Sequence, residues 1–295
     1  MATDTFPNRP LTMLIGFNPG GSTDVQAQVL APILAEILGQ PVELLHQSGA
    51  GGAVAAAMLA SSPDQGYIFQ YGLSLPFTFS PLASRASYNH LSFRYVAGVT
   101  LDQAALVTGP STPFTDWAGF LEYARANPGT VYATQNIQDR FIINHIADQE
   151  GLTFRIVPTT GGAGMAPLIL SGDAHFAFSG GTHSAYTESG QMHVLASLAD
   201  ERLVYYPDAP TLRELGYDVS MHAVRVIAVP ANTPDYQVDI LRRALEQAVE
   251  DPRFIAVTEQ TIKMPVVFMD EEQLNKLFAE QVEEYKLLIL NSTDE

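Results

Sequence analysis

Backbone amides in two glycine-rich turns near the start of the chain have the composition of an anion-binding site. The turns are Pro19-Gly20-Gly21, after the apolar segment Leu11–Phe17, and Gly49-Ala50-Gly51-Gly52, after Pro41–His46. Each turn leads into a predicted helix, whose first N–H groups lack intrahelical partners and carry a positive partial charge. Glycine lets the backbone approach a ligand closely. The turns therefore predict a seat for a negatively charged group at the carboxyl edge of a parallel sheet.

Two arginines could add charge to such a site. Arg140 lies at the start of the helix predicted at Asp139–Glu150, where its planar fork could pair with a distal ligand carboxylate or with a neighbour such as Asp139. Arg225 lies in an apolar strand, where a charge needs a partner. Either a ligand in a cleft or an interlobe salt bridge would serve, and the sequence leaves both alternatives open.

The composition excludes several other chemistries. The 295 residues include no cysteine, which excludes disulfides and thiolate catalysis, and the net charge of −17 leaves no basic face for nucleic acid. The scattered histidines lack metal-ligand spacing, and no nucleophile elbow or phosphate-binding loop is complete. We therefore expect no metal and no cofactor. Residues 1–7 have neither a basic start nor an apolar stretch, which predicts either a cytoplasmic protein or a mature form without its secretory signal.

Strands and helices alternate along the chain in two rounds. The first round runs to about Thr100, the second starts near Ala104, and a last strand at Val224–Val229 precedes the C-terminal helices. This order predicts an α/β fold with two lobes. We expect lobe 1 to combine residues 1–100 with 226–295, lobe 2 to span 101–225, and the two crossing segments to form a hinge. The stretch Leu73–Phe93 is expected to be irregular and to cover the surface.

Four segments make the chain resemble a known family. They are Phe17-Asn18-Pro19-Gly20-Gly21-Ser22-Thr23-Asp24, Gly49-Ala50-Gly51-Gly52, Thr160-Gly161-Gly162-Ala163 with Leu170-Ser171-Gly172-Asp173, and Pro207-Asp208-Ala209-Pro210-Thr211-Leu212-Arg213-Glu214-Leu215-Gly216. In order and spacing they resemble the Bug-type solute receptors of tripartite tricarboxylate transporters. The resemblance implies a periplasmic binding protein of the Venus flytrap type, which closes on a small organic carboxylate such as a dicarboxylate or aromatic acid. It also implies membrane transporter subunits as partners, a periplasmic location and no enzymatic activity, and we expect a monomer.

The glycine turns, the arginines and the resemblance together predict the ligand-binding residues. In lobe 1 and the hinge they are Phe17, Gly20, Gly21, Ser22, Ala50, Gly51, Gly52, Ser74 and Arg225. In lobe 2 they are Thr134, Gln135, Asn136, Arg140, Thr160, Gly161, Gly162, Ala163, Ser179 and Gly180.

Three segments depart from the family pattern. They are Ser179-Gly180-Gly181, where an acid or Asn is usual, Gln135–Arg140, where a small Gly/Ser-rich loop is usual, and Ser220–Arg225, where an aromatic pair is usual. Because they fall where lobe 2 would read the far end of the ligand, they leave the ligand's identity open.

Two other classes of protein remain as alternatives. An α/β enzyme could use the same loops for a small anionic or phosphorylated substrate, although no general base stands out. An effector-sensing domain is a further alternative, against which the lack of a helix-turn-helix counts.

Overall fold

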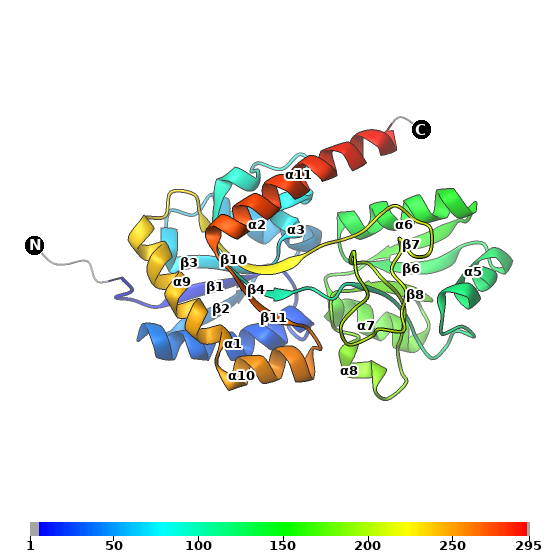
Figure 1. The fold of residues 1–295 in the computed structure, drawn as a ribbon, viewed down its shortest axis with the longest axis horizontal. Helices are drawn as coiled ribbons and strands as arrows, with labels where there is room; N and C mark the ends of the chain where they lie inside the picture. The colour runs from blue at the N-terminus through cyan, green and yellow to red at the C-terminus, as the bar shows by residue number, and fades with distance from the viewer. Residues whose placement is uncertain (1–5, 294–295) are drawn as a thin grey trace, which may run out of the picture.

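The computed structural model describes residues 6–293, and it contains two sheets, each covered by helices (Figure 1). The first has six strands in the order β11-β4-β10-β3-β1-β2, and the second has five in the order β7-β6-β8-β5-β9. Lobe 1 denotes below the first sheet with its helices, and lobe 2 the second sheet with its helices. The expected α/β, two-lobed fold is confirmed. Residues 1–5, which include most of the segment examined for a secretory signal, lie outside the described residues.

Lobe 1 is assembled from both ends of the chain. Its strands are β1 (Leu11–Ile15), β2 (Val42–His46), β3 (Ile68–Leu73), β4 (Phe93–Leu101), β10 (Val224–Pro230) and β11 (Val266–Met269). Its helices are α1 (Ser22–Leu38), η1 (Ala50–Gly52), α2 (Ala53–Ala60), η2 (Gln65–Tyr67), α3 (Leu75–Thr78), α4 (Ser80–Ala83), η3 (His90–Ser92), α9 (Asp235–Val249), α10 (Pro252–Ile255), η4 (Ala256–Thr261) and α11 (Glu271–Thr293). Strands β1, β2 and β3 are parallel, so their glycine turns meet at one edge of the sheet.

Lobe 2 is built from one continuous stretch of chain. Its strands are β5 (Ala105–Thr108), β6 (Thr130–Thr134), β7 (Phe154–Pro158), β8 (Phe176–Ser179) and β9 (His193–Ser197). Its helices are α5 (Trp117–Ala126), α6 (Ile137–Glu150), α7 (Gly162–Ser171) and α8 (Ser184–Thr187). The parallel trio β7-β6-β8 again places two strand-to-helix turns, before α6 and α7, at one edge.

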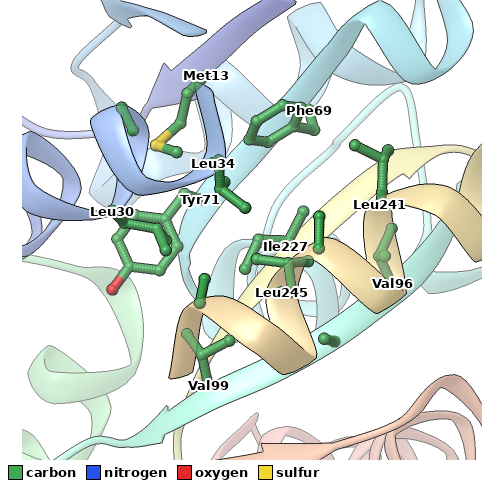
Figure 2. Close-up of a cluster of buried hydrophobic side chains, with 14 of the residues drawn as sticks. Met13, Leu30, Leu34, Phe69, Tyr71, Val96, Val99, Ile227, Leu241 and Leu245 are labelled. Carbon is green, nitrogen blue, oxygen red and sulfur yellow. The ribbon is translucent and has the colours of Figure 1, made fainter. Parts of the chain in front are cut away.

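Apolar side chains fill both faces of each sheet. In lobe 1, α1 and α9 cover one face, where Leu30, Leu34, Leu241 and Leu245 pack against Phe69 and other strand residues (Figure 2). Helices α2 and α11 cover the opposite face. In lobe 2, α5 and α6 cover one face and α7 the other. Each sheet therefore has a core of its own, which makes each lobe a stable platform for its loops.

Two segments cross between the lobes. One joins β4 to β5 and the other precedes β10, and the Asp102 N–H donates to the Ala223 carbonyl between them at 2.9 Å. They pass side by side at the centre of the molecule (Figure 1). Strand β10 begins at Val224, two residues before the expected boundary at residue 226. The proposed boundaries at residues 100/101 and 225/226 stay a prediction.

The stretch Leu73–Phe93 differs from its prediction. It contains two short helices, α3 and α4, and residues 71–80 are all buried beneath α11 and the neighbouring chain. Phe77 and Phe79 are fully buried, and Phe79 packs edge-on against Phe141 of lobe 2 at a centroid separation of 5.6 Å. The Pro and Ser residues that suggested a surface loop instead begin the two helices, since Pro is accepted in a first helical turn.

Candidate functional site

The largest opening described in the molecule lies between the two lobes. It is a cavity of about 430 Å³, here called the outer cavity, which is within the range of small-molecule sites. Lobe 1 contributes the turn before α2 and one side of α4, and lobe 2 contributes the loops that follow β6 and β7. Its lining residues are Ala50, Gly51, Ala53, Ser80, Ser84, Thr134, Gln135, Asn136, Ile137, Arg140, Pro158, Thr159 and Thr160.

Arg140 is the one charged side chain among these lining residues, and no carboxylate is present. Its side chain is exposed and forms no hydrogen bond or ion pair with the rest of residues 6–290. The N–H of Gly51 likewise has no partner within the described chain. In a protein with a net charge of −17, this wall is positively polarised and offers unsatisfied donors. Such a cavity favours an anion.

Asp139 holds the loop between β6 and α6 in place. Its buried carboxylate accepts hydrogen bonds from the backbone N–H groups of Gln135 at 2.8 Å and Asn136 at 2.9 Å, and from the hydroxyls of Tyr132 and Thr134. Burial raises the pKa of the Asp139 carboxyl to about 6, and these donors oppose that shift. Asn136 caps α6 by accepting from the Asp139 N–H at 2.9 Å. The loop that carries Arg140 is therefore positioned by its own internal contacts.

A second, much smaller opening lies deeper between the lobes. This inner cavity has a volume of about 20 Å³, which is room for about one water molecule. It is lined by Phe17, Gly21, Ser22, Thr23, Leu73, Gln135, Gly162, Phe178, Gly180 and Thr182. Gln135 lines both cavities, and its side-chain amide donates to the Phe178 carbonyl at 2.7 Å. The N–H groups of Thr23 and Gly162 have no partner in the described chain, but the space before them is too small for an organic acid.

The lobes touch on both sides of the cleft. A Cβ built on Gly51 would lie 2.7 Å from Cβ of Asn136, and one on Gly161 would lie 3.0 Å from Cδ1 of Phe17. The Asn18 side-chain amide also donates to the Thr160 hydroxyl at 2.6 Å. These contacts define a closed arrangement of the two lobes.

Comparison with known proteins identifies this architecture. A model of the tripartite tricarboxylate transporter family receptor matches residues 26–293. The chain belongs to that receptor family. BugT of Bordetella pertussis is 29% identical over 306 residues, which cover 97% of this chain and 90% of BugT. Among solved structures, the periplasmic binding protein BugD aligns with a TM-score of 0.86 at 21% identity, covering 98% of this chain and 99% of BugD. MatC from Rhodopseudomonas palustris, solved with bound malate, aligns with a TM-score of 0.86 at 22% identity, covering 96% of this chain and all of MatC.

In this receptor the predicted site residues fall into three groups. Ala50, Gly51, Thr134, Gln135, Asn136, Arg140 and Thr160 line the outer cavity. Phe17, Gly21, Ser22, Gly162 and Gly180 line the inner cavity, together with Gln135. Gly20, Gly52, Ser74, Gly161, Ala163, Ser179 and Arg225 line neither.

The third group has structural contacts instead. The Gly20 N–H donates to the buried Asp24 carboxylate at 2.8 Å, and Ser74 exchanges backbone hydrogen bonds with Val224. The Ser179 hydroxyl contacts Nδ1 of the buried His183 at 2.9 Å and points away from both cavities. These groups already have protein partners, so they shape the cleft from behind its surface.

The sequence missed several residues that line the outer cavity. Ser80 and Ser84 lie in the stretch that was expected to be a surface loop, and Thr159 precedes the predicted glycine turn of lobe 2. Ser80 follows Leu75–Thr78 directly, so a helical reading of the Ser-Pro pair at Ser80-Pro81 is the signal that could have found it.

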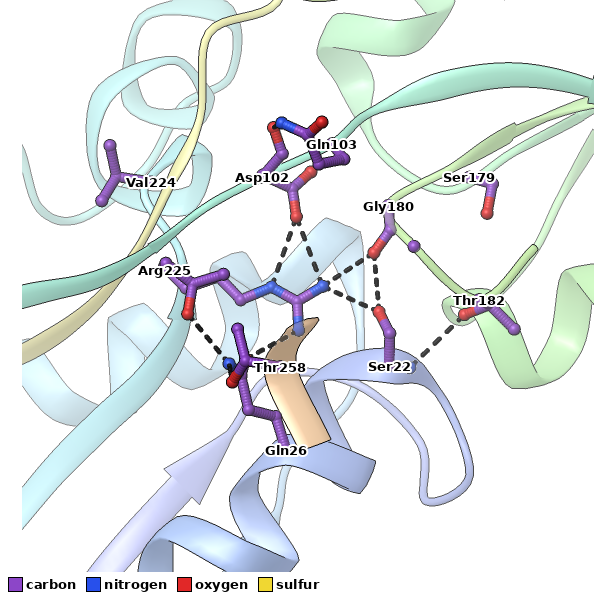
Figure 3. Close-up of polar contacts among 12 residues, drawn as sticks. Ser22, Gln26, Asp102, Gln103, Ser179, Gly180, Thr182, Val224, Arg225 and Thr258 are labelled. Carbon is purple, nitrogen blue, oxygen red and sulfur yellow. Dashed lines mark hydrogen bonds and ion pairs between the residues drawn. The ribbon is translucent and has the colours of Figure 1, made fainter. Parts of the chain in front are cut away.

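Arg225 is part of the hinge. It is fully buried, and its guanidinium pairs with Asp102 of the crossing segment, with Nε and Nη2 each 3.3 Å from Oδ1 (Figure 3). Of the two alternatives left open by the sequence, the structure contains the salt bridge. Burial raises the pKa of the Asp102 carboxyl, although the neighbouring guanidinium opposes that shift.

Residues 6–293 contain no group of three or more His, Cys, Asp or Glu side chains arranged to hold a metal ion. In the same part of the chain, no helix has the length and apolarity needed to cross a membrane.

Proposed function

We propose that this receptor captures a small organic carboxylate in the outer cavity and delivers it to the membrane subunits of a tripartite transporter. The observation that supports this most directly is the charge of the cavity wall, which has an unpaired arginine, a free Gly51 N–H and no carboxylate. Hydrogen bonds to an ionised group contribute about 1.5–3 kcal/mol each, so a few of them suffice to hold a small acid. MatC, a structural neighbour, was solved with malate.

The assignment of roles follows the lining residues. Arg140 would pair with one carboxylate of the ligand, and the hydroxyls of Ser80, Ser84, Thr159 and Thr160 would hydrogen-bond to its other polar atoms. The ligand would bind the closed arrangement more tightly than an open one and so shift the population of lobe arrangements. We propose a periplasmic, monomeric, non-enzymatic protein, with a membrane transporter as its partner.

Isothermal titration calorimetry with a defined panel tests this function. The panel contains malate, succinate and benzoate as acids, glucose as a neutral solute, and putrescine as a cation. We expect saturable heat with at least one acid and none with glucose or putrescine. Binding of glucose or putrescine with no binding of any acid would overturn the proposal.

A further inference from the structure

Arg225 links three parts of the molecule that are far apart in the sequence. Its Nη2 lies 2.8 Å from the Ser22 hydroxyl at the start of α1 and 2.7 Å from the Gly180 carbonyl in lobe 2. Its Nη1 donates to the Gln26 side-chain carbonyl at 3.1 Å, and Asp102 in the crossing segment balances its charge. Figure 3 shows the guanidinium at the centre of these groups. A single side chain therefore contacts both lobes and the hinge.

The Gly180 carbonyl is the point where lobe 2 is attached. It accepts from Arg225 and also from the Ser22 hydroxyl, at 2.6 Å, so it has two donors from the lobe 1 side. The Ser22 N–H adds a longer contact of 3.4 Å to the Thr182 hydroxyl. These bonds cross the inner end of the cleft, where the cavity holds only about one water. Protein atoms thus occupy positions that a ligand could otherwise use.

Opening of the lobes would disrupt this cluster. If Gly180 moved away, Arg225 would remain beside Asp102 but would lose one of its short hydrogen bonds, and Ser22 would lose its acceptor. A hydrogen-bond donor that loses its partner in a buried site is costly, and more so when it is charged. The closed arrangement satisfies all of these groups without any ligand.

We propose that Arg225 is a positioning residue that keeps the inner end of the cleft closed in the absence of ligand, through Ser22 and Gly180. The ligand then enters a receptor whose binding-competent state is already populated, so less of its binding energy is used to close the lobes. This inference concerns the balance between open and closed lobes and does not depend on which solute binds.

Pulsed electron spin resonance can measure that balance directly. The chain has no cysteine, so spin labels at two introduced cysteines would be its only labels. Leu91→Cys in lobe 1 and Glu122→Cys in lobe 2 place labels at exposed positions away from both cavities. In the protein without ligand we expect one dominant, short interlobe distance. A dominant long distance would overturn the proposal.

Arg225→Lys tests the residue itself. Lysine keeps the charge opposite Asp102 but cannot reach Ser22, Gly180 and Asp102 together with a fixed fork. We expect the ratio of open to closed molecules to rise about tenfold or more, since hydrogen bonds of a charged group are lost. Ser22→Ala, which leaves the Arg225–Asp102 pair intact, should shift the ratio in the same direction by a smaller factor.

Arg94→Lys is the matched control. Arg94 also pairs with carboxylates, Glu271 and Asp235, but all its partners lie in lobe 1. It should lower the melting temperature without lengthening the interlobe distance. If Arg225→Lys and Ser22→Ala give the same distance distribution as Arg94→Lys, Arg225 is only a structural residue and the proposal fails. Should Arg225→Lys not fold, the distances in Ser22→Ala decide alone.

Discussion

At the scale of single residues, Arg140 and Arg225 show how differently two arginines can be used. Arg140 is exposed to the outer cavity and unpaired within the described side chains, whereas Arg225 is buried and bonded on all sides. A cation without a protein partner can exchange its water for a ligand carboxylate at little cost. A buried cation cannot be exposed without breaking the contacts that satisfy it.

Arg140→Gln should weaken the binding of a dicarboxylate by about 10- to 100-fold, because it removes the charged hydrogen bonds to one carboxylate. A monocarboxylate of the same length should lose less, if it binds through the lobe 1 amides. Calorimetry on both ligands measures the difference. Arg155→Gln, which removes an exposed charge of lobe 2 outside the cavities, is the control. Equal losses in the two variants would show that only net charge matters.

His183 makes a prediction about pH. Burial lowers its pKa to about 4, so the unfolded chain binds a proton before the folded one as the pH falls from about 6.5. Its contribution is therefore a loss of stability on acidification, about 3 kcal/mol by pH 4. The raised pKa of Asp139, about 6, acts in the opposite direction over the same window, since the folded chain takes up that proton first.

His183→Leu should remove the destabilising contribution and leave that of Asp139. Relative to the parent protein, the free energy of unfolding should rise as the pH is lowered from 6.5 to 4. Urea midpoints at several pH values measure this, and His145→Leu, at an exposed position, should follow the parent curve. Parallel curves for His183→Leu and the parent would contradict the buried, neutral state of His183.

At the scale of elements, strand-to-helix turns carry the site, and each is fixed by contacts that differ from turn to turn. Asp24 holds the first turn through the Gly20 N–H and also contacts Nε2 of His46 at 2.7 Å. Asp139 and Asn136 hold the turn before α6. The turn at Gly51 instead depends on space, since its backbone has a φ of +64° and faces Asn136 of the other lobe.

Gly51→Ala should therefore weaken ligand binding by about five- to a hundred-fold, the equivalent of about 1–3 kcal/mol of overpacking, because its methyl group would force the lobes apart. Gly39→Ala is a matched control, with a similar φ of +68° but no neighbour within 4 Å of the added carbon. Both variants should lose some stability from the left-handed backbone. Affinity measurements and melting curves separate the two effects, and equal affinities would refute a steric role for Gly51.

At the scale of the whole molecule, lobe 2 is continuous in sequence and has a core of its own, whereas lobe 1 needs both ends of the chain. We therefore expect a polypeptide of residues 103–222 to fold by itself. It should be less stable than the full chain, because Phe17, Leu73 and Leu75 of lobe 1 pack against its core. Circular dichroism and the dispersion of amide NMR signals measure this. A disordered polypeptide would contradict the proposed division into lobes.

The sequence by itself determined the elements and the kind of site. Hydrophobic periodicity and glycine turns act locally, so they predicted the start of α1 at Ser22, the parallel order of β1 and β2, and the loops that meet between the lobes. Buried short helices such as α3 and α4 have no clear periodicity, and their burial comes from α11, which lies some two hundred residues away in the chain. Local pattern therefore mistook them for a surface loop.

Only the tertiary structure decided which of the converging groups face open space. Ser22, Gly180 and Arg225 come from three distant segments, and their mutual hydrogen bonds fill the inner end of the cleft. Arg140 has no such partner and is left facing the outer cavity. The physical reason is that a polar group's availability depends on what lies within about 3 Å of it, and contacts between distant segments do not appear in the order of residues.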